Sequence, residues 1–283
     1  MTGRTCAQAL GAAQSFGLAR IDAQLLLLHA LGKSHGDRAW LLAHDTDVLD
    51  DDILRQFDAL ARRRAAGEPL AYLVGYKAFF GLNLSVDARV LIPRPDTETL
   101  VNWSLEVLRS DAMPAESEVL DLGTGSGAIA LGIAQHLKTA GRPGRVMATD
   151  ASADALAVAL ENASRLRLDV AFIESSWLEK VSGHFHVIAS NPPYVADADP
   201  HLADLTHEPL NALTAGPDGL DDLRQIIEQA PGHLHPGGWL LLEHGFDQAL
   251  PVRDLLAQRG FLQVQSRLDL AGIERCSGGQ WQG

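Results

Sequence analysis

The sequence predicts an α/β protein: a doubly wound, mainly parallel sheet preceded by a small helical N-terminal domain. Two patterns lead to this prediction. From residue 118 onward, short apolar runs alternate with helical stretches, as in chains built from strand–helix–strand units. From residue 5 to about residue 64, apolar residues recur at helical spacing. A chain of 283 residues is long enough to hold both parts.

The N-terminal pattern predicts a bundle of about four helices, with breaks at Gly17, Gly32 and Gly36. The segment 73–86 that follows is typical of a β-hairpin, with Gly81 near its turn. We therefore expect three parts: a helical bundle over residues 1–70, a hairpin connector over 71–90 and an α/β domain over 91–283.

The α/β domain is expected to open with a helix. Pro93 and Pro95 impose an extended path, after which Asp96 or Thr97 can cap the helix. The apolar runs then predict strands over 118–122, 145–149, 169–175, 185–189 and 238–243. The stretches between them predict helices over 128–137, 152–168, 218–234 and 246–259. The last two runs, 261–268 and 274–277, are expected to close the sheet as an antiparallel pair.

A glycine-rich turn joins the first strand of this series to its helix. Its residues are Gly123, Thr124, Gly125, Ser126 and Gly127. Glycines permit the tight turn and close backbone approach that nucleotide sites need. The G-x-G-x-G spacing differs from the dinucleotide fingerprint, and the absence of a following P-loop lysine disfavours a triphosphate. Asp150 ends the next strand, about where an acidic residue meets ribose hydroxyls in such folds.

Asn191-Pro192-Pro193-Tyr194 follow the apolar run 186–190. The Asn191 amide oxygen and the Pro192 carbonyl are acceptors, the prolines carry no competing N–H, and Tyr194 offers a flat face. A planar nitrogen is a poor nucleophile because its lone pair is delocalised. The tetrapeptide therefore indicates a site that holds an NH₂ group and aims it at an electrophile. A strand that ends in a proline turn is the alternative interpretation of these residues alone.

These motifs resemble those of a known family. Residues 121–127, Asp-Leu-Gly-Thr-Gly-Ser-Gly, followed by Asn-Pro-Pro-Tyr resemble the class I S-adenosylmethionine-dependent N-methyltransferases, which have a Rossmann-like fold. Further segments narrow the resemblance to the peptide-chain release factor N5-glutamine methyltransferases. These are Leu-Ile-Pro-Arg-Pro-Asp-Thr-Glu at 91–98, Glu-Pro-Leu-Asn-Ala-Leu at 208–213 and Leu-Leu-Leu-Glu-His-Gly at 240–245. The first is the most family-specific, since the sister family acting on a ribosomal protein typically has Pro-Arg-Ser-Pro there.

The resemblance covers residues 70–276 by motif and the N-terminal part by architecture only. It implies S-adenosyl-L-methionine as the cofactor, with the glycine turn around its methionine part, Asp150 at the ribose and Trp177 beside the adenine. Family members often carry an acidic residue just before Trp177, where this chain has Ser176. Asn191 would touch both cofactor and substrate.

The reaction implied by the resemblance is methyl transfer to the side-chain N5 of the glutamine in the Gly-Gly-Gln motif of class I peptide-chain release factors. Asn191, Pro192 and Tyr194 would be catalytic, and Pro193 would join them in binding the substrate. The helical N-terminal part would help to dock the protein substrate.

Charge and composition restrict the alternatives. Residues 1–80 carry nine basic and nine acidic side chains, so the net charge of −13 falls on residues 81–283. Such an acidic domain is poorly suited to binding phosphates, so direct nucleic-acid binding is not expected.

The two cysteines, Cys6 and Cys276, indicate reduced thiols rather than a disulfide framework. No membrane span or signal layout is recognised, so a cytoplasmic protein is expected.

No metal is expected either, because the pairs His184-x-His186 and His233-x-His235 have no cysteine or carboxylate partner nearby in sequence.

Two other functions remain open. One is an adenine-N6 methyltransferase of DNA or RNA, since Asn-Pro-Pro-Tyr also serves that chemistry. The other is a non-catalytic adaptor that retains a methyltransferase fold.

Overall fold

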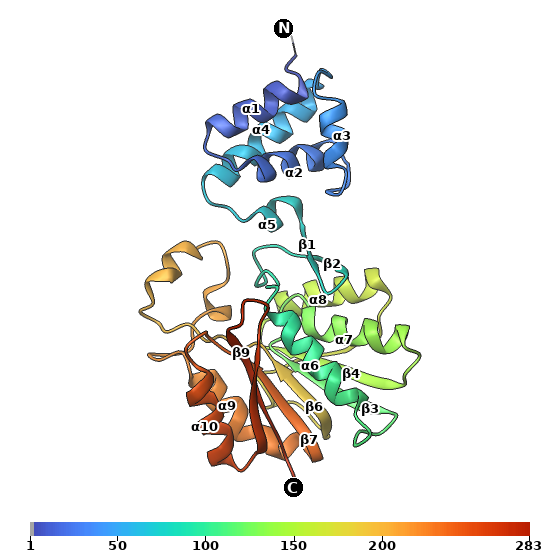
Figure 1. Cartoon of the computed structure of the whole chain (residues 1–283), viewed down its shortest axis with the longest axis vertical. Coiled ribbons are helices and arrows are strands. Elements are labelled where there is room, and N and C mark those ends of the chain that lie inside the picture. The colour runs from blue at the N-terminus through green and yellow to red at the C-terminus, as the bar shows by residue number, and fades with distance from the viewer. Residues whose placement is uncertain (1–2) are drawn as a thin grey trace. The chain divides into compact units, whose positions relative to one another are not determined.

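The computed structural model describes residues 3–283, so the first two residues of the predicted bundle lie outside the described residues. The chain forms two compact units, which divide between Tyr76 and Lys77 (Figure 1). Every helix among the described residues is too short or too polar to cross a membrane.

The first unit is a set of helices around an apolar core. Its first helix begins with a capping box, in which the Thr5 hydroxyl accepts the Gln8 N–H and the Gln8 side chain accepts the Thr5 N–H. Leu26, Leu27 and Phe57 are fully buried in its core. The helices are α1 (Cys6–Ser15), α2 (Arg20–Ala30), α3 (Arg38–Ala43), α4 (Asp51–Ala65) and α5 (Leu70–Val74).

Helix α5 was not predicted, since the sequence pattern placed residues 73–86 in a hairpin. Pro69 precedes the helix and Gly75 ends it with a left-handed φ of 80°. A proline before the first turn and a glycine after the last one both favour a short helix. The two-stranded hairpin therefore begins only at Tyr76, with β1 (Tyr76–Phe79) and β2 (Leu82–Ser85).

A seven-stranded sheet lies at the centre of the second unit, counted over the described residues, in the order β5-β4-β3-β6-β7-β9-β8. Strands β3 to β7 run parallel, and β9 is antiparallel to both β7 and β8. The predicted doubly wound, mainly parallel sheet is thus confirmed. The strands are β3 (Ser117–Leu122), β4 (Gly144–Asp150), β5 (Ala171–Glu174), β6 (Phe185–Ser190), β7 (Leu234–Glu243), β8 (Leu262–Leu268) and β9 (Glu274–Gln280).

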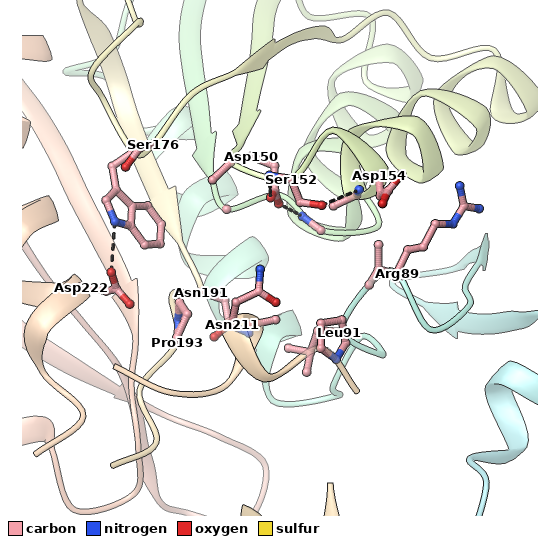
Figure 2. A pocket seen from close by; sticks show the side chains of 18 of the residues that line it. Arg89, Leu91, Asp150, Ser152, Asp154, Ser176, Asn191, Pro193, Asn211 and Asp222 are labelled. Carbon is pink, nitrogen blue, oxygen red and sulfur yellow. Dashed lines mark hydrogen bonds between the residues drawn. The ribbon is translucent and has the colours of Figure 1, made fainter. Parts of the chain in front are cut away.

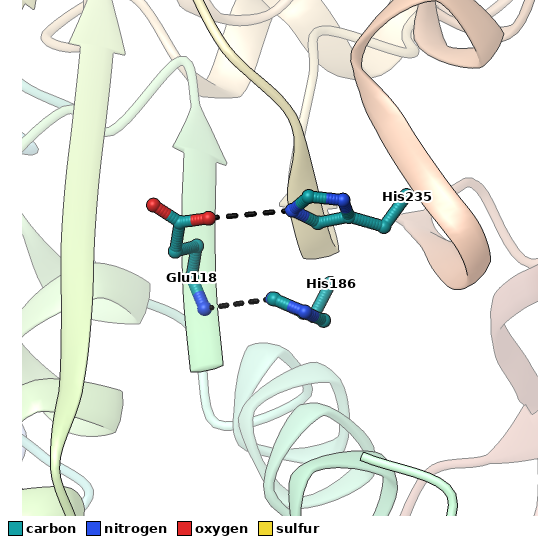
Figure 3. Close-up of side chains that lie close together, drawn as sticks. All are labelled: Glu118, His186 and His235. Atoms are coloured by element: carbon teal, nitrogen blue, oxygen red, sulfur yellow. Dashed lines mark hydrogen bonds and ion pairs between the residues drawn. The ribbon is translucent and has the colours of Figure 1, made fainter. Parts of the chain in front are cut away.

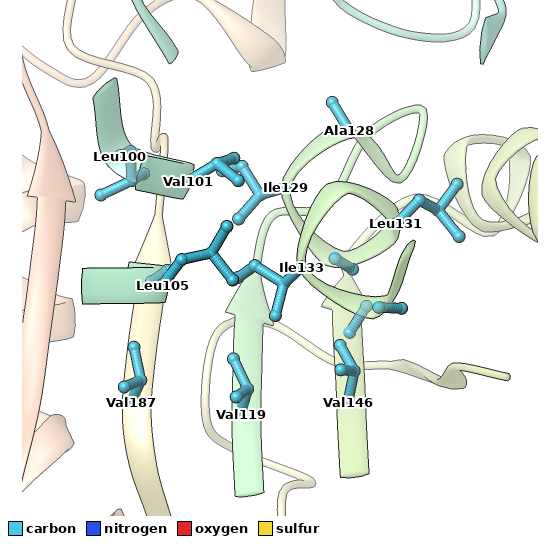
Figure 4. Packing of buried hydrophobic residues seen from close by; sticks show 14 of the residues in the cluster. Leu100, Val101, Leu105, Val119, Ala128, Ile129, Leu131, Ile133, Val146 and Val187 are labelled. Atoms are coloured by element: carbon cyan, nitrogen blue, oxygen red, sulfur yellow. The ribbon is translucent and has the colours of Figure 1, made fainter. Parts of the chain in front are cut away.

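Apolar side chains on the two faces of the sheet form separate cores. Successive strand residues point to opposite faces, so Val119 packs with α6 and α7 while Leu120 packs with α9 and α10. Figure 4 shows Val119, Val146 and Val187 in a row facing Ile133 of α7. The helices of this unit are α6 (Thr97–Arg109), α7 (Ala128–Thr139), α8 (Ala153–Leu166), α9 (Asp221–Gln229) and α10 (Ala249–Arg259).

Some element boundaries differ from the prediction. The helix expected over 218–234 is α-helical only from Asp221 to Gln229 and continues as a 3-10 turn, because Pro231 lacks the N–H that an α-helix needs. Strand β7 begins earlier than expected, at Leu234. Strand β9 continues to Gln280, which pairs with Trp239 of β7.

Candidate active site

The carboxyl ends of β3 and β6 meet where the strand order reverses. Strands β4 and β5 extend the sheet on one side of β3, whereas β6 and β7 extend it on the other. A reversal of this kind opens a crevice beyond the strand ends, which is where ligands bind in doubly wound sheets. The glycine turn follows β3 and Asn191 follows β6, so the topology brings these two motifs to one crevice.

The glycine turn is tied to the end of the neighbouring strand. The Thr124 N–H donates to a carbonyl of β4 at 2.8 Å, and the Gly125 N–H donates to the Asp150 carboxylate at 2.8 Å. Gly127 has a φ of 86°, and a Cβ at this position would lie 2.8 Å from a methyl carbon of Leu131. Only glycine therefore fits at the last position of the turn without strain.

Two buried side chains that the sequence analysis missed support the turn from behind. The Asp121 carboxylate accepts the Thr124 hydroxyl at 2.6 Å and a backbone N–H of α7 at 3.1 Å. Burial raises the pKa of Asp121 to about 7, although these hydrogen bonds lower it. Asn162 of α8 donates to the carbonyls of Ser85 and Ser126, each at 3.0 Å. An acid between apolar residues just before the glycine turn was a readable signal for Asp121, whereas nothing local marks Asn162.

A cavity of about 560 Å³ opens beyond these strand ends, within the usual range for cofactor sites (Figure 2). The predicted cofactor residues that line it are Gly123, Gly125, Asp150, Trp177 and Asn191. The remaining predicted residues of the glycine turn are buried and do not line the cavity. These are Thr124, Ser126 and Gly127. Residues that were not predicted to bind cofactor also line the cavity; they are residues 88–91, Pro209, Asn211 and Ala212.

Trp177 forms one wall of the cavity and is held in place by its neighbours. Its φ of 46° is uncommon for a residue other than glycine. The indole N–H donates to the Asp222 carboxylate at 3.1 Å, and the ring approaches within 3.2 Å of where a Cβ on Gly123 would lie. Asp222 was not predicted from the sequence. It places a carboxylate on the cavity wall, whereas Ser176, at the position where family members often have an acid, contributes only a hydroxyl.

Asn191 follows β6, and α6 holds its side chain. Its Nδ2 donates to the Thr97 hydroxyl at 3.2 Å, whereas its Oδ1 is buried without a hydrogen-bond partner among the described residues. A buried polar atom left unpaired costs about 1–3 kcal/mol. Such an acceptor is suited to a ligand that brings its own N–H.

The cap predicted for α6 is not formed. Neither Asp96 nor Thr97 makes a side-chain cap hydrogen bond. Asp96 is already in the helical conformation, with φ of −61° and ψ of −34°, which does not suit an N-cap. The Thr97 hydroxyl instead accepts the Asn191 amide.

A second cavity, of about 160 Å³, adjoins Asn191. All of the predicted substrate residues line it, namely Asn191, Pro192, Pro193 and Tyr194. Asn191 and Pro193 line both cavities, so they stand between them. The Tyr194 hydroxyl lies 3.5 Å from the buried Glu243 carboxylate, and burial raises the pKa of Tyr194 well above its usual value, which keeps the phenol neutral.

Two of the segments that carry the family resemblance, 91–98 and 208–213, contact each other beside the smaller cavity. The Glu208 carboxylate is buried, accepts the Ile92 N–H at 3.1 Å and pairs with the Arg94 guanidinium. Arg94 itself lines the smaller cavity. The loop after β6 is therefore fastened to the segment before α6, which shapes the space beside Asn191.

The structure brings a carboxylate that is distant in sequence next to one histidine of each pair. Figure 3 shows Glu118, His186 and His235 together, near the amino ends of β3, β6 and β7. Their potential ligand atoms lie within 4.8 Å of one another. His235 Nε2 lies 3.3 Å from Glu118, and His186 Nδ1 accepts the Glu118 N–H at 3.0 Å. His186 is thus held by a hydrogen bond at Nδ1, and a neutral imidazole that accepts at Nδ1 carries its proton on Nε2.

Known families match both units of the chain. The model for the PrmC N-terminal domain matches residues 4–75, and that for the Methyltransferase small domain matches residues 102–265. A release factor glutamine methyltransferase of Bordetella pertussis is 50% identical over 267 residues, which cover 93% of this chain and 95% of the relative. The chain belongs to the release factor glutamine methyltransferase family. Another member, from Xylella fastidiosa, is 47% identical over 279 residues, with 97% and 98% covered.

This result confirms the family that the sequence motifs indicated. Solved structures support the fold independently. A methyltransferase from Pyrococcus furiosus superimposes with a TM-score of 0.52 at 21% identity, over 78% of this chain and 97% of that one. The T. thermophilus 16S rRNA N2 G1207 methyltransferase, solved with AdoMet and guanosine, gives a TM-score of 0.51 at 19% identity. The match covers 73% of this chain and 49% of that one.

Proposed function

We propose that this chain transfers a methyl group from S-adenosyl-L-methionine to the side-chain N5 of the glutamine in the Gly-Gly-Gln motif of class I peptide-chain release factors. Its family membership supports the reaction and the kind of substrate. One observation of its own carries the proposal: Asn191 stands between a large and a small cavity with a buried oxygen that lacks a partner among the described residues.

The larger cavity suits S-adenosylmethionine. Gly123 and Gly125 present backbone at its edge, Asp150 offers a carboxylate for ribose hydroxyls, and Trp177 offers a flat apolar face for a base. When bound, the cofactor supplies a methyl group on a positively charged sulfur, which needs no covalent link to the enzyme.

The smaller cavity suits a glutamine side chain. Asn191 Oδ1 and the Pro192 carbonyl accept the two hydrogens of the substrate amide and so fix the direction of its nitrogen. The same acceptors stabilise the positive charge that develops on that nitrogen. Orientation of this kind can supply up to roughly 7–11 kcal/mol of the barrier. Tyr194 packs beside the amide, and no residue is assigned as a general base.

A labelled-methyl assay tests the reaction directly. Purified release factor should be methylated by the chain, and a release factor with the Gly-Gly-Gln glutamine replaced by alanine should not be. DNA serves as the control substrate, because an adenine-N6 methyltransferase would label it. Label on DNA alone would favour that alternative, and cofactor binding without turnover on either substrate would favour a non-catalytic adaptor.

The first unit is proposed to dock the protein substrate, since the cavities are lined by residues of the second unit only, among the residues described. Removing residues 1–75 should therefore raise the KM for release factor more than it changes the Kd for S-adenosylmethionine. Steady-state kinetics and calorimetry on the truncated chain measure the two quantities. An equal loss of both, with a lower unfolding temperature, would show that the first unit serves stability instead.

A further inference from the structure

A buried glutamine contacts the tetrapeptide of residues 191–194 and lines neither cavity. Gln248 directly precedes α10 and is 8% exposed. Its side chain forms hydrogen bonds to three segments that are distant from one another in sequence. These segments are the tetrapeptide, residues 218–219 and Gly245, which ends the segment 240–245 of the family resemblance. Burying a polar side chain is costly unless it is bonded, so the partners of Gln248 are informative.

Backbone partners fix the direction in which the Gln248 amide points. Its Oε1 accepts the Gly245 N–H at 2.8 Å, and its Nε2 donates to the Tyr194 carbonyl at 3.0 Å. The carbonyls of Asp218 and Gly219 each lie 3.3 Å from the same nitrogen and share its hydrogens. A backbone N–H only donates and a backbone carbonyl only accepts. The opposite orientation of the amide would therefore break all of these bonds.

The backbone of Tyr194 is held through both its carbonyl and its N–H. Gly219 has a φ of 71°, and a Cβ there would lie 2.2 Å from the Tyr194 carbonyl oxygen and 2.9 Å from Gln248 Nε2. Only glycine permits this close approach without a shift of the chain. The Leu213 carbonyl accepts the Tyr194 N–H at 3.2 Å and the Val195 N–H at 2.9 Å. The end of the tetrapeptide is thus fastened to two loops.

The prolines transmit this restraint to an acceptor of the proposed site. The rings of Pro192 and Pro193 fix φ, so few free rotations separate the Pro192 carbonyl from the Tyr194 carbonyl. Strand β6 ends at Ser190 and is paired with β3, which holds the other end of the segment. Holding both ends of a stiff segment limits the directions that the Pro192 carbonyl can take.

We infer that Gln248 is a positioning residue, which holds the Tyr194 carbonyl and thereby keeps the Pro192 carbonyl aimed at the substrate NH₂. This inference rests on the proposed function, because the Pro192 carbonyl is one of the two acceptors assigned there. Pro192 and Tyr194 line the smaller cavity and not the larger one. Gln248 should therefore act on methyl transfer and not on the binding of S-adenosylmethionine.

Replacing Gln248 with leucine tests this role. Leucine is similar in size and forms no side-chain hydrogen bonds, so Gln248→Leu should lower kcat about tenfold, the rate equivalent of one hydrogen bond. The Kd for S-adenosylmethionine, measured by calorimetry, should stay close to that of the wild type. A wild-type kcat would overturn the inference. So would a loss of cofactor affinity as large as the loss of rate.

A glutamate at the same position separates hydrogen bonding from packing. When ionised, its carboxylate has no hydrogen to donate to the Tyr194 carbonyl. When protonated, its O–H can donate there while the other oxygen accepts the Gly245 N–H. The kcat of Gln248→Glu, divided by the wild-type kcat at the same pH, should therefore rise as the pH is lowered. A ratio that does not change with pH would overturn the inference.

The matched control is Gln258→Glu, at an exposed glutamine of α10, whose ratio to the wild type should stay constant with pH. Dividing by the wild-type kcat removes the titration of groups that both proteins share. The titratable and charged side chains on the segments that contact Gln248 are Asp218 with its ion-pair partner Arg224, Asp247, His244 and Tyr194.

Hydrogen exchange tests the inference without turnover. In Gln248→Leu, the amide hydrogens of Tyr194 and Val195 should exchange faster than in the wild type, because one restraint on this backbone is lost. Those of Thr124 and Gly125 in the glycine turn should exchange at the wild-type rate. Unchanged exchange at Tyr194 and Val195 overturns the inference. A wild-type chain that methylates no release factor overturns the proposed function instead, whatever the exchange rates are.

Discussion

Replacing Asn191 with alanine should lower the rate of methyl transfer about a hundredfold or more while S-adenosylmethionine still binds. The substitution removes Oδ1, which is buried without a partner among the described residues and is the acceptor assigned to the substrate NH₂. Loss of one preorganised group that stabilises developing charge typically costs about 3–4 kcal/mol in the transition state. The larger cavity keeps its other walls, including Gly123, Asp150 and Trp177, so cofactor binding should remain measurable.

The comparison requires kcat on purified release factor and the Kd for S-adenosylmethionine from calorimetry. Asn102→Ala is the matched control, because Asn102 is an exposed asparagine on the neighbouring helix α6. It should behave as the wild type in both measurements. A near-normal rate in Asn191→Ala would refute the assigned role. Complete loss of cofactor binding would instead make Asn191 a cofactor residue first.

The glycine turn and its surroundings could be predicted because their causes are local. A strand ending just before Gly123 and a helix beginning after Gly127 are encoded in neighbouring residues, and the φ of 86° at Gly127 requires a glycine. Asp150 could be placed because the next parallel strand, β4, ends beside this turn. Asn191 could be placed in the same way at the end of β6. Such strand ends share one edge of a parallel sheet once the alternation of elements is recognised.

The side chains that hold the site could not be predicted, because their partners are distant in sequence. Thr97 has the type and position of a helix cap, yet its hydroxyl meets Asn191, and only the packing of α6 on the sheet decides between these partners. Asp222 lies in an ordinary acidic first turn of α9 and becomes significant only because the Trp177 indole reaches it. Glu243 reads as the polar end of an apolar strand.

Replacing Asp150 with alanine should weaken the binding of S-adenosylmethionine about tenfold to a hundredfold. The Asp150 carboxylate accepts the Gly125 N–H at 2.8 Å and the Ser152 N–H at 2.9 Å, one on each oxygen. A carboxylate has about four lone-pair sites, so acceptor capacity remains for the ribose hydroxyls. A hydrogen bond to a charged group is worth about 1.5–3 kcal/mol, which corresponds to the expected change in Kd.

Calorimetry at neutral and mildly acidic pH tests this role more sharply than one measurement can. Burial raises the pKa of Asp150, and backbone hydrogen bonds from Ser152 and Gly125 only partly oppose this. Because the protonated form has lost acceptor sites, wild-type affinity should fall as the pH is lowered toward that raised pKa, and Asp150→Ala should lack this component. Asp111→Ala, at an exposed aspartate, should keep the wild-type affinity and pH dependence. Equal affinities in the wild type and Asp150→Ala would mean that this carboxylate orders the glycine turn without touching the cofactor.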